Sequence, residues 1–149
     1  MRAGGTWMSE QLLDVIVGQR AQADASCRHH SFELFEGNEL VAVTLGYSIG
    51  RCYHDYSMAT FVRDKRSLGH LLTKAQGHLL KNAGYSIWYF GIKGEYMKEF
   101  DSYGGANLDR IEFHRKWMKA RAEKPKDGGR VDEGILRRHP EYSFIPCGD

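Results

Sequence analysis

The chain has 149 residues, of which 42% are apolar and 27% charged, and its formal net charge is +2. These values are ordinary for one globular domain and leave little room for a second. No uninterrupted apolar run is long enough to span a bilayer, so we expect no membrane association.

The cysteines and the N-terminus both favour a reducing compartment. Cys27, Cys52 and Cys147 lie far apart and are odd in number, which argues against a disulfide framework. Asp14 interrupts the apolar run "LLDVIV", so the N-terminus has no hydrophobic signal core. We therefore expect a cytoplasmic protein, and its oligomeric state stays open.

Positive charge is concentrated late in the chain. Residues 110–138 hold ten Lys/Arg against five Asp/Glu, whereas residues 1–109 hold eleven against twelve. Such a segment can bind a polyanion by releasing its counterions. The alternative is a solvated helix face, and charge alone does not decide between the two.

The first half of the chain predicts a helix followed by three strands. In "SEQLLDVIVGQR" (9–20), leucine, isoleucine and valine recur at helical spacing. The segments 31–37, 40–50 and 51–61 read as strands, of which "SFELFEG" alternates clearly, and short connections containing glycine join them. We expect these strands to form an antiparallel meander.

The second half predicts a long helix, a strand and further helices. Residues 67–82 carry one apolar stripe, which Asp64 or Ser67 can cap and which Asn82 and Gly84 can end. Its apolar positions are Leu68, Leu71, Leu72, Ala75 and Leu79. "YSIWYFG" (85–91) reads as a strand buried on both faces.

The remaining segments are more polar. "EYMKEFDSYGG" (95–105) predicts a short helix, and "DRIE" fits a capping box at the start of a helix over 109–121. Phe113 and Trp117 share the inner face of that helix. We expect residues 122–134 to be mobile, and "YSFIP" to dock as an edge strand.

This element order predicts an α+β fold with a mixed, mostly antiparallel sheet flanked by helices. If the third and fourth strands are parallel neighbours, the long helix makes a right-handed β–α–β crossover. Such an arrangement resembles the GNAT-like acyltransferase fold. We expect residues 1–121 to form this domain, and residues 122–149 to form a charged connection and a tail that packs on it.

Two possible ligand motifs are incomplete. "CRHH" (27–30) and "CYH" (52–54) lack the paired spacing of a zinc site, so we expect no metal. "RSLGHL" (66–71) partly fits the loop that holds the pyrophosphate of acetyl-CoA at a helix N-terminus, but Leu71 stands where a small residue is needed. An ordinary helix start explains the same residues.

The polar row "CYHDYSM" (52–58) lies on a predicted strand. Regular alternation puts Cys52, His54, Tyr56 and Met58 on one face. The other face then carries Tyr53, Asp55 and Ser57. That second face could line a polar groove, or it could simply be exposed to solvent.

Several segments in order resemble the leucyl/phenylalanyl-tRNA–protein transferases. They are "FELFEGNELVAV", "DYSM", "SIWYFG", "SYGGA" and "DRIEF", and "TWMSEQLLDVI" resembles the Trp-led helix of that family. The resemblance covers roughly residues 6–120 and implies a C-terminal GNAT-like domain. That family moves Leu or Phe from aminoacyl-tRNA to the N-terminal amine of an acceptor protein, in a reaction of the N-end rule, without a cofactor.

The resemblance also implies roles for individual residues. Trp7 and Tyr53 match aromatic residues beside the aminoacyl-adenosine, and Met58 matches a residue of the apolar pocket for the transferred side chain. The substrate-binding residues it implies are Trp7, Thr44, Tyr53, Ser57, Met58, Leu72, Ala75 and Leu79. A pocket of this kind selects its substrate by apolar fill.

The catalytic residues depart from the family. Tyr56 stands where the family has Glu, and Phe90 or Gly91 stands where it has Gln. We therefore expect Asp55 to act as the base, with the Tyr56 hydroxyl as a substitute donor. Asp55 precedes the Glu position by one residue, so it would need a β-bulge to reach the face that Met58 occupies.

The resemblance covers only the family's C-terminal domain, so we expect some tRNA contacts to be absent or supplied by other means. The basic helix is the expected site for tRNA phosphates. Its candidate residues are Arg110, Arg115, Lys116, Lys119 and Arg121. Two other functions stay open. One is an acetyl-CoA-dependent N-acetyltransferase of the GNAT fold, and the other is a catalytically silent binding module of that fold.

Overall fold

The computed structural model describes residues 11, 14–15, 26–62, 67–91 and 94–126. Residues 11, 14 and 15 are helical, as predicted, and the rest of the helix expected over 9–20 lies outside the described residues. So do the tail "YSFIP" and most of the stretch over 122–134. The elements are β1 (Cys27–Glu36), β2 (Glu39–Ile49), β3 (Cys52–Thr60), α2 (Leu68–Asn82), β4 (Ile87–Tyr89), the 3₁₀ helix η1 (Glu95–Tyr103) and α3 (Arg110–Ala122).

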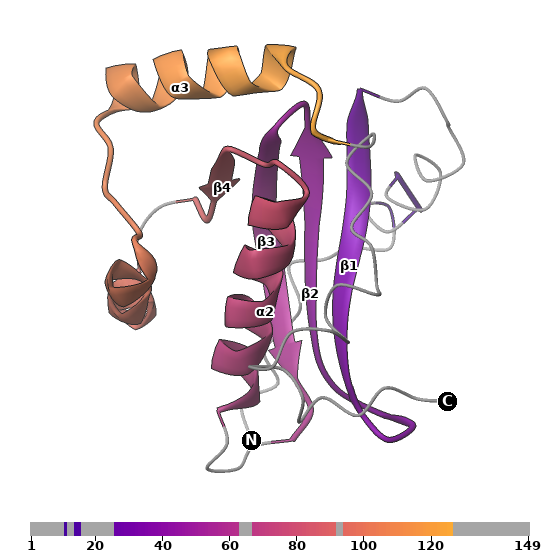
Figure 1. The fold of residues 1–149 in the computed structure, drawn as a ribbon. Helices are drawn as coiled ribbons and strands as arrows, with labels where there is room; N and C mark the ends of the chain where they lie inside the picture. The colour runs from indigo at the N-terminus through magenta and orange to yellow at the C-terminus, as the bar shows by residue number, and fades with distance from the viewer. Residues whose placement is uncertain (1–10, 12–13, 16–25, 63–66, 92–93, 127–149) are drawn as a thin grey trace.

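The sheet has four strands in the order β1-β2-β3-β4. The first three form the predicted antiparallel meander, and β4 pairs parallel to β3 after the crossover through α2. Figure 1 shows α2 lying along one face of this sheet and α3 crossing one end of it. The α+β class and the mixed sheet are confirmed.

The fourth strand is shorter and less buried than predicted. It pairs with β3 only through Cys52–Ile87, Tyr53–Trp88 and His54–Tyr89. All three of its residues are partly exposed, so the prediction of a strand buried on both faces is wrong. The reason is its position: β4 is the last strand of the sheet, and beyond His54 the described part of β4 no longer accompanies β3.

A β-bulge interrupts β3 in the middle of the polar row. Leu45 pairs with Ser57 and Gly46 pairs with Asp55, so Tyr56 is the extra residue. On the helix side of the sheet, Tyr53 and Asp55 are therefore followed by Met58 instead of Ser57. The regular alternation predicted from the sequence is wrong beyond Asp55, because the bulge reverses the faces of the residues that follow it.

The core lies between α2 and the sheet. Leu68, Leu72, Ala75 and Leu79 of the predicted stripe are buried, whereas Leu71 is only partly buried at the margin of the cluster. From the sheet, Phe32, Leu34, Val41, Ala42 and Tyr53 complete the core. Burying large apolar side chains at about 25 cal/mol per Å² is the main force that holds α2 on the sheet.

The ends of the helices follow the predicted signals in part. Ser67 occupies the N-cap position of α2 in a left-handed conformation and its side chain makes no capping bond. Asp109 caps α3, and its Oδ1 accepts from the backbone N–H groups of Ile111 (2.8 Å) and Glu112 (2.9 Å). The Glu112 carboxylate pairs with Lys116 at 3.0 Å, one turn further along the helix.

Helix α3 is mostly exposed and docks on the sheet through one narrow face. Phe113 and Trp117 are half-buried, as predicted, and Ala120 is buried. The Ala120 carbonyl accepts from the backbone N–H of Arg51 at 2.8 Å, and the Phe113 ring lies 4.6 Å from that of Tyr89. None of the described helices has both the length and the apolar character needed to cross a bilayer.

Candidate functional site

Asp55 is held between α2 and β4 by two side-chain donors. Gln76 Nε2 of α2 donates to Oδ1 at 3.1 Å and to Oδ2 at 3.0 Å. The indole Nε1 of Trp88 donates to Oδ2 at 2.7 Å. These bonds fix the orientation of the carboxylate before any ligand arrives.

The orientation of Gln76 is itself fixed. The Thr44 hydroxyl donates to Gln76 Oε1 at 3.1 Å, which leaves the amide N–H groups facing Asp55. An ionised carboxylate can only accept, so this arrangement satisfies all three residues. Thr44 and Gln76 are fully buried, and the chain Thr44–Gln76–Asp55 is thus a polar network inside the core.

Burial makes Asp55 a weaker acid than usual. Desolvation raises the pKa of its carboxyl from 3.8 to about 6, although the bonds from Gln76 and Trp88 act in the opposite direction. A carboxylate with a pKa near neutrality can take up a proton and release it again at physiological pH. Such values are common at catalytic sites.

The bulge at Tyr56 brings Met58 to the same face of β3 as Asp55. Met58 is 42% exposed. It lies beside Gly69 in the first turn of α2, where a Cβ would come within 3.3 Å of the Met58 sulfur. Asp55 and Met58 therefore both lie at the edge of the α2–sheet interface, with the Asp55 carboxylate further inside and the Met58 thioether at the surface.

An aromatic row continues from Trp88 away from Asp55. The Trp88 and Phe90 ring centroids are 4.5 Å apart, and Phe90 stacks on Phe100 of η1 at 4.8 Å. All three rings are partly exposed. Asp55 thus has an apolar wall on its β4 side.

The interior that the sequence assigned to a substrate pocket is filled. The predicted pocket residues in the described part of this interior are each at most 4% exposed, so they pack against other side chains of the protein. They are Thr44, Tyr53, Leu72, Ala75 and Leu79. The rings of His30, Phe32 and Tyr85 surround Tyr53. Trp7, expected at the mouth of the pocket, lies outside the described residues, so a substrate-binding role for these residues stays a prediction.

Tyr56 and Ser57 do not converge on Asp55. The Tyr56 ring lies 6.3 Å from Tyr47 and 6.4 Å from His29, both on the face of the sheet that α2 does not cover. Ser57 pairs with Leu45 on that same face. Tyr56, expected as a substitute donor, therefore lies on the opposite face of the sheet from Asp55, and its donor role stays a prediction.

The five cations predicted to bind tRNA are all exposed on α3. Lys116 pairs with Glu112, and the Arg121 guanidinium lies 4.9 Å from the centre of the Trp117 ring. Among the described residues, no carboxylate pairs with Arg115 or Lys119. Arg110 begins the helix next to its cap, Asp109.

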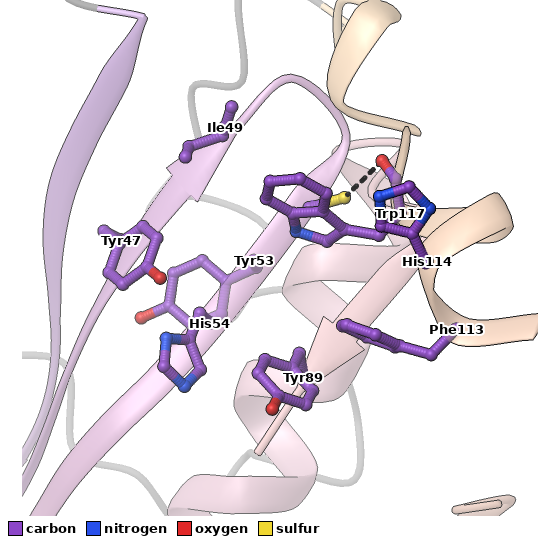
Figure 2. Close-up of a pocket in the computed structure, with 9 residues that line it drawn as sticks. Tyr47, Ile49, Tyr53, His54, Tyr89, Phe113, His114 and Trp117 are labelled. Carbon is purple, nitrogen blue, oxygen red and sulfur yellow. Dashed lines mark hydrogen bonds between the residues drawn. The ribbon is translucent and has the colours of Figure 1, made fainter. Parts of the chain in front are cut away.

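A separate cleft of ≈ 260 Å³ lies on the other face of the sheet, between the sheet and α3. Figure 2 shows rings from β2, β3, β4 and α3 around it. The Cys52 thiol donates a hydrogen bond to the Trp117 carbonyl at 3.7 Å. We call it the aromatic cleft, and its lining is Tyr47, Ile49, Cys52, Tyr53, His54, Tyr89, Phe113, His114 and Trp117. It does not include Asp55.

Sequence reasoning missed Gln76 and Trp88 as partners of Asp55. Gln76 had a readable signal, because it lies four residues after Leu72 and three before Leu79 on an otherwise apolar stripe. A glutamine on the buried face of a helix requires an internal partner. Trp88 was hidden in an apolar strand, where an indole N–H gives no pattern of its own.

The histidines and cysteines of "CRHH" and "CYH" form no ligand cluster in the described structure. In the parts of the chain that the structure describes, no three His, Cys, Asp or Glu side chains are grouped as metal ligands would be. His30 is instead hydrogen-bonded to the Ser48 hydroxyl at 2.7 Å.

No protein-family model and no curated protein matches this chain.

Proposed function

We propose that this protein transfers an aminoacyl group from aminoacyl-tRNA to the N-terminal amine of an acceptor protein, on a GNAT-like fold, with Asp55 as the general base. The observation that carries the proposal is the position of Asp55. It is oriented by Gln76 and Trp88, has a pKa raised to about 6, and shares a face with Met58.

The fold supports the proposal in two ways. The antiparallel meander, the crossover through α2 and the parallel β4 follow the element order of the resemblance. Gln76 also provides a side-chain amide beside the acid, although from α2 and not from the end of the fourth strand, where the family has its Gln. In this proposal Asp55 and Gln76 take the roles that Glu and Gln have in the family.

The chemistry needs one proton acceptor. The acceptor's α-amine attacks the ester carbonyl, and a C–N bond forms as the carbonyl oxygen becomes an oxyanion. Asp55 takes the proton from the now positive nitrogen. When the oxyanion collapses, the C–O bond to ribose breaks and the proton passes from Asp55 to the ribose oxygen. Holding both substrates at this edge supplies much of the acceleration.

The filled interior changes where the transferred side chain would lie. Met58 is exposed beside Asp55, so in this proposal Leu or Phe rests against Met58 and the aromatic row of Trp88 and Phe90. The buried residues Thr44 and Leu72 then support the site without contacting the substrate. Thr44 orients Gln76, and Leu72 supports the helix that carries it.

The direct test is an assay with Leu-tRNA or Phe-tRNA and a peptide that begins with Arg or Lys. We expect a mass increase of one aminoacyl residue on the peptide N-terminus by mass spectrometry. Asp55→Asn should lower the rate roughly 10²–10⁴-fold while the protein stays folded. Lys74→Glu, on the exposed face of α2, is a matched surface control and should change little.

A second candidate is a binding module without activity, and the filled interior favours it. If folded protein gives no product above the enzyme-free reaction, the transferase proposal is wrong and the binding module is preferred. Thermal stabilisation by acetyl-CoA, but not by an aminoacyl-adenosine analogue, would instead favour an N-acetyltransferase.

A further inference from the structure

The aromatic cleft is built from a continuous line of rings. The ring centroids are 5.0 Å apart between Tyr47 and His54, and 4.8 Å apart between His54 and Tyr89. The line continues onto α3, where Phe113 lies 4.6 Å from Tyr89. The last two ring pairs are tilted by 30° and 34°, so Tyr89 lies between the rings of His54 and Phe113, and the row ends at Phe113.

The size of the cleft suits one small planar group. Its volume of ≈ 260 Å³ falls just below the range of about 300–1,000 Å³ that is typical for drug-sized ligands. A single ring system fits within this volume. Figure 2 shows Tyr89 and Phe113 next to each other at one side, with Trp117 and His114 above them on α3.

The lining is neutral and apolar in character. None of its nine residues is Asp, Glu, Lys or Arg. Burial lowers the pKa of His54 and raises those of Tyr47 and Cys52, to about 11 for the Cys52 thiol. These three groups are therefore uncharged near pH 7. The Arg121 guanidinium lies 4.9 Å from the centre of the Trp117 ring, and this positive charge at the cleft disfavours an ammonium ligand relative to a neutral ring.

A second, basic cleft borders the same helix. Its volume is ≈ 360 Å³, and its charged lining residues are Arg51, Lys116, Lys119 and Glu123, of which Glu123 pairs with Arg51. Lys119 is exposed, and no carboxylate among the described residues pairs with it. Arg115 lies four residues before Lys119 on α3 and is likewise exposed. Cations beside a flat neutral cleft are the combination by which proteins bind unpaired nucleic acid.

We infer that the aromatic cleft takes one unpaired base of a single-stranded RNA whose phosphates pass along α3 at Lys119, in the neighbouring basic cleft. The base extends this row by stacking at its Phe113 end, which works for any base because every base has a π-face. The binding site itself does not depend on Asp55. Identifying the strand as the 3′ end of the tRNA rests on the proposed function.

The test measures binding without transfer. We would titrate the full chain into a fluorescein-labelled single-stranded RNA of about six nucleotides at about 50 mM salt and follow the anisotropy. We expect saturable binding, and weaker binding to a duplex of the same length. Absence of saturable binding to the single strand, or equally tight binding to the duplex, would overturn the inference.

Phe113 gives a matched pair of variants. Phe113→Leu keeps an apolar side chain but removes the ring, so we expect roughly tenfold weaker binding with an unchanged salt dependence. Phe113→Tyr keeps the ring and should bind like the original protein. Circular dichroism and a thermal melt check that both are folded. Equal binding by the two folded variants would contradict stacking in the cleft.

Charge variants test the phosphate path. Lys119→Glu should weaken binding and lower the slope of log affinity against log salt by roughly one, whereas Lys74→Glu on α2 should leave both unchanged. An unchanged slope for Lys119→Glu would remove α3 from the interface. Displacement of the RNA by an apolar dipeptide, but not by adenosine, would also overturn the inference, since the cleft would then be a peptide site.

The two proposals fail separately. Asp55→Asn should lower the rate of transfer roughly 10²–10⁴-fold and keep RNA binding. If RNA binds through Phe113 but no aminoacyl product forms, the cleft stands and the transferase is wrong. If transfer occurs equally with Phe113→Leu, the transferase stands and the cleft does not bind the tRNA.

Discussion

Asp55 accepts from two side chains that belong to different elements, and its charge is largely removed from water. The protein could have satisfied the same donors with a neutral amide at lower cost. A carboxyl in this position destabilises the folded state once it ionises, because its pKa is raised from 3.8 to about 6. Sites where a shifted pKa destabilises the folded protein in this way are often functional.

The pH dependence of stability follows from this shift. A carboxyl whose pKa is raised on folding stabilises the protein fully below about pH 3.8, and that contribution is lost as the pH rises through about 6. The loss amounts to about 3 kcal/mol, since each pKa unit is worth about 1.4 kcal/mol. Asp55→Asn should not show it.

Denaturant titrations at several pH values between about 4 and 8 measure the difference. We expect the gap in unfolding free energy between Asp55→Asn and the original protein to widen in favour of Asn as the pH rises. A gap that stays constant across this range would mean that Asp55 is not desolvated as described.

Helix α2 carries Gln76 on its buried face, and the next residue, Gly77, lies against the Trp88 ring. A Cβ at Gly77 would lie 2.8 Å from the Trp88 ring, so the absence of a side chain there lets the indole reach Asp55. The helix therefore contributes one hydrogen-bond donor to Asp55, Gln76, and leaves room for the second donor, Trp88. Glycine in a helix costs about 1 kcal/mol relative to alanine, which this packing offsets.

Gly77→Ala tests that packing. We expect the indole to be pushed off Asp55, with a net loss of about 0–2 kcal/mol, because overpacking costs about 1–3 kcal/mol and the helix gains about 1. Gly69→Ala is the matched control, since its neighbours Met58 and Thr60 are 3.3 and 3.4 Å away and the Met58 side chain can move. Tryptophan fluorescence and thermal melts should change for Gly77→Ala more than for Gly69→Ala. The opposite order would contradict the packing argument.

At the scale of the whole molecule, the two faces of the sheet carry different chemistry. The α2 face holds the acid and its amide, whereas the other face holds the aromatic cleft under α3. Figure 1 shows that α3 lies across one end of the sheet, next to the β2–β3 connection. There Arg51 Nη1 pairs with Glu123 at 2.7 Å, and its Nε donates to the Gly84 carbonyl at 2.6 Å.

The docking of α3 depends on a glycine in this connection. Gly50 has φ +55°, and a Cβ there would collide with the Arg121 carbonyl. Gly37 has nearly the same φ, +60°, but a Cβ at that position would meet nothing within 4 Å. Gly37→Ala should therefore cost only the backbone term of about 1–2 kcal/mol.

Gly50→Ala should cost about 1–3 kcal/mol more than that, because it also displaces the helix. Hydrogen exchange should report faster exchange in α3 for Gly50→Ala and not for Gly37→Ala. Equal exchange in the two variants would show that α3 does not need this close approach.

Alternation and the apolar stripe are enough to predict the meander, the crossover helix and the capped basic helix. The bulge in β3 cannot be predicted directly, because an extra residue in a strand leaves no signature of its own. It is inferred only as what Asp55 would need to share a face with Met58. The fourth strand is predicted but its shortness and exposure are not, since the apolar residues of "SIWYFG" read alike whether they are buried or at an edge. Asp55 is identified from its sequence neighbours, whereas its partners come from elements 21 and 33 residues away.

The extra residue in β3 has a consequence for how such a protein could change. Loss of the Tyr56 codon would straighten the strand, yet Ser57 would still face outward and Met58 would still share the side of Asp55. An added codon in β2, between Leu45 and Gly46, would instead give Tyr56 a partner and restore strict alternation, with Ser57 turned inward and Met58 outward. The acid and the thioether could thus be separated by an insertion in a neighbouring strand that alters neither of them.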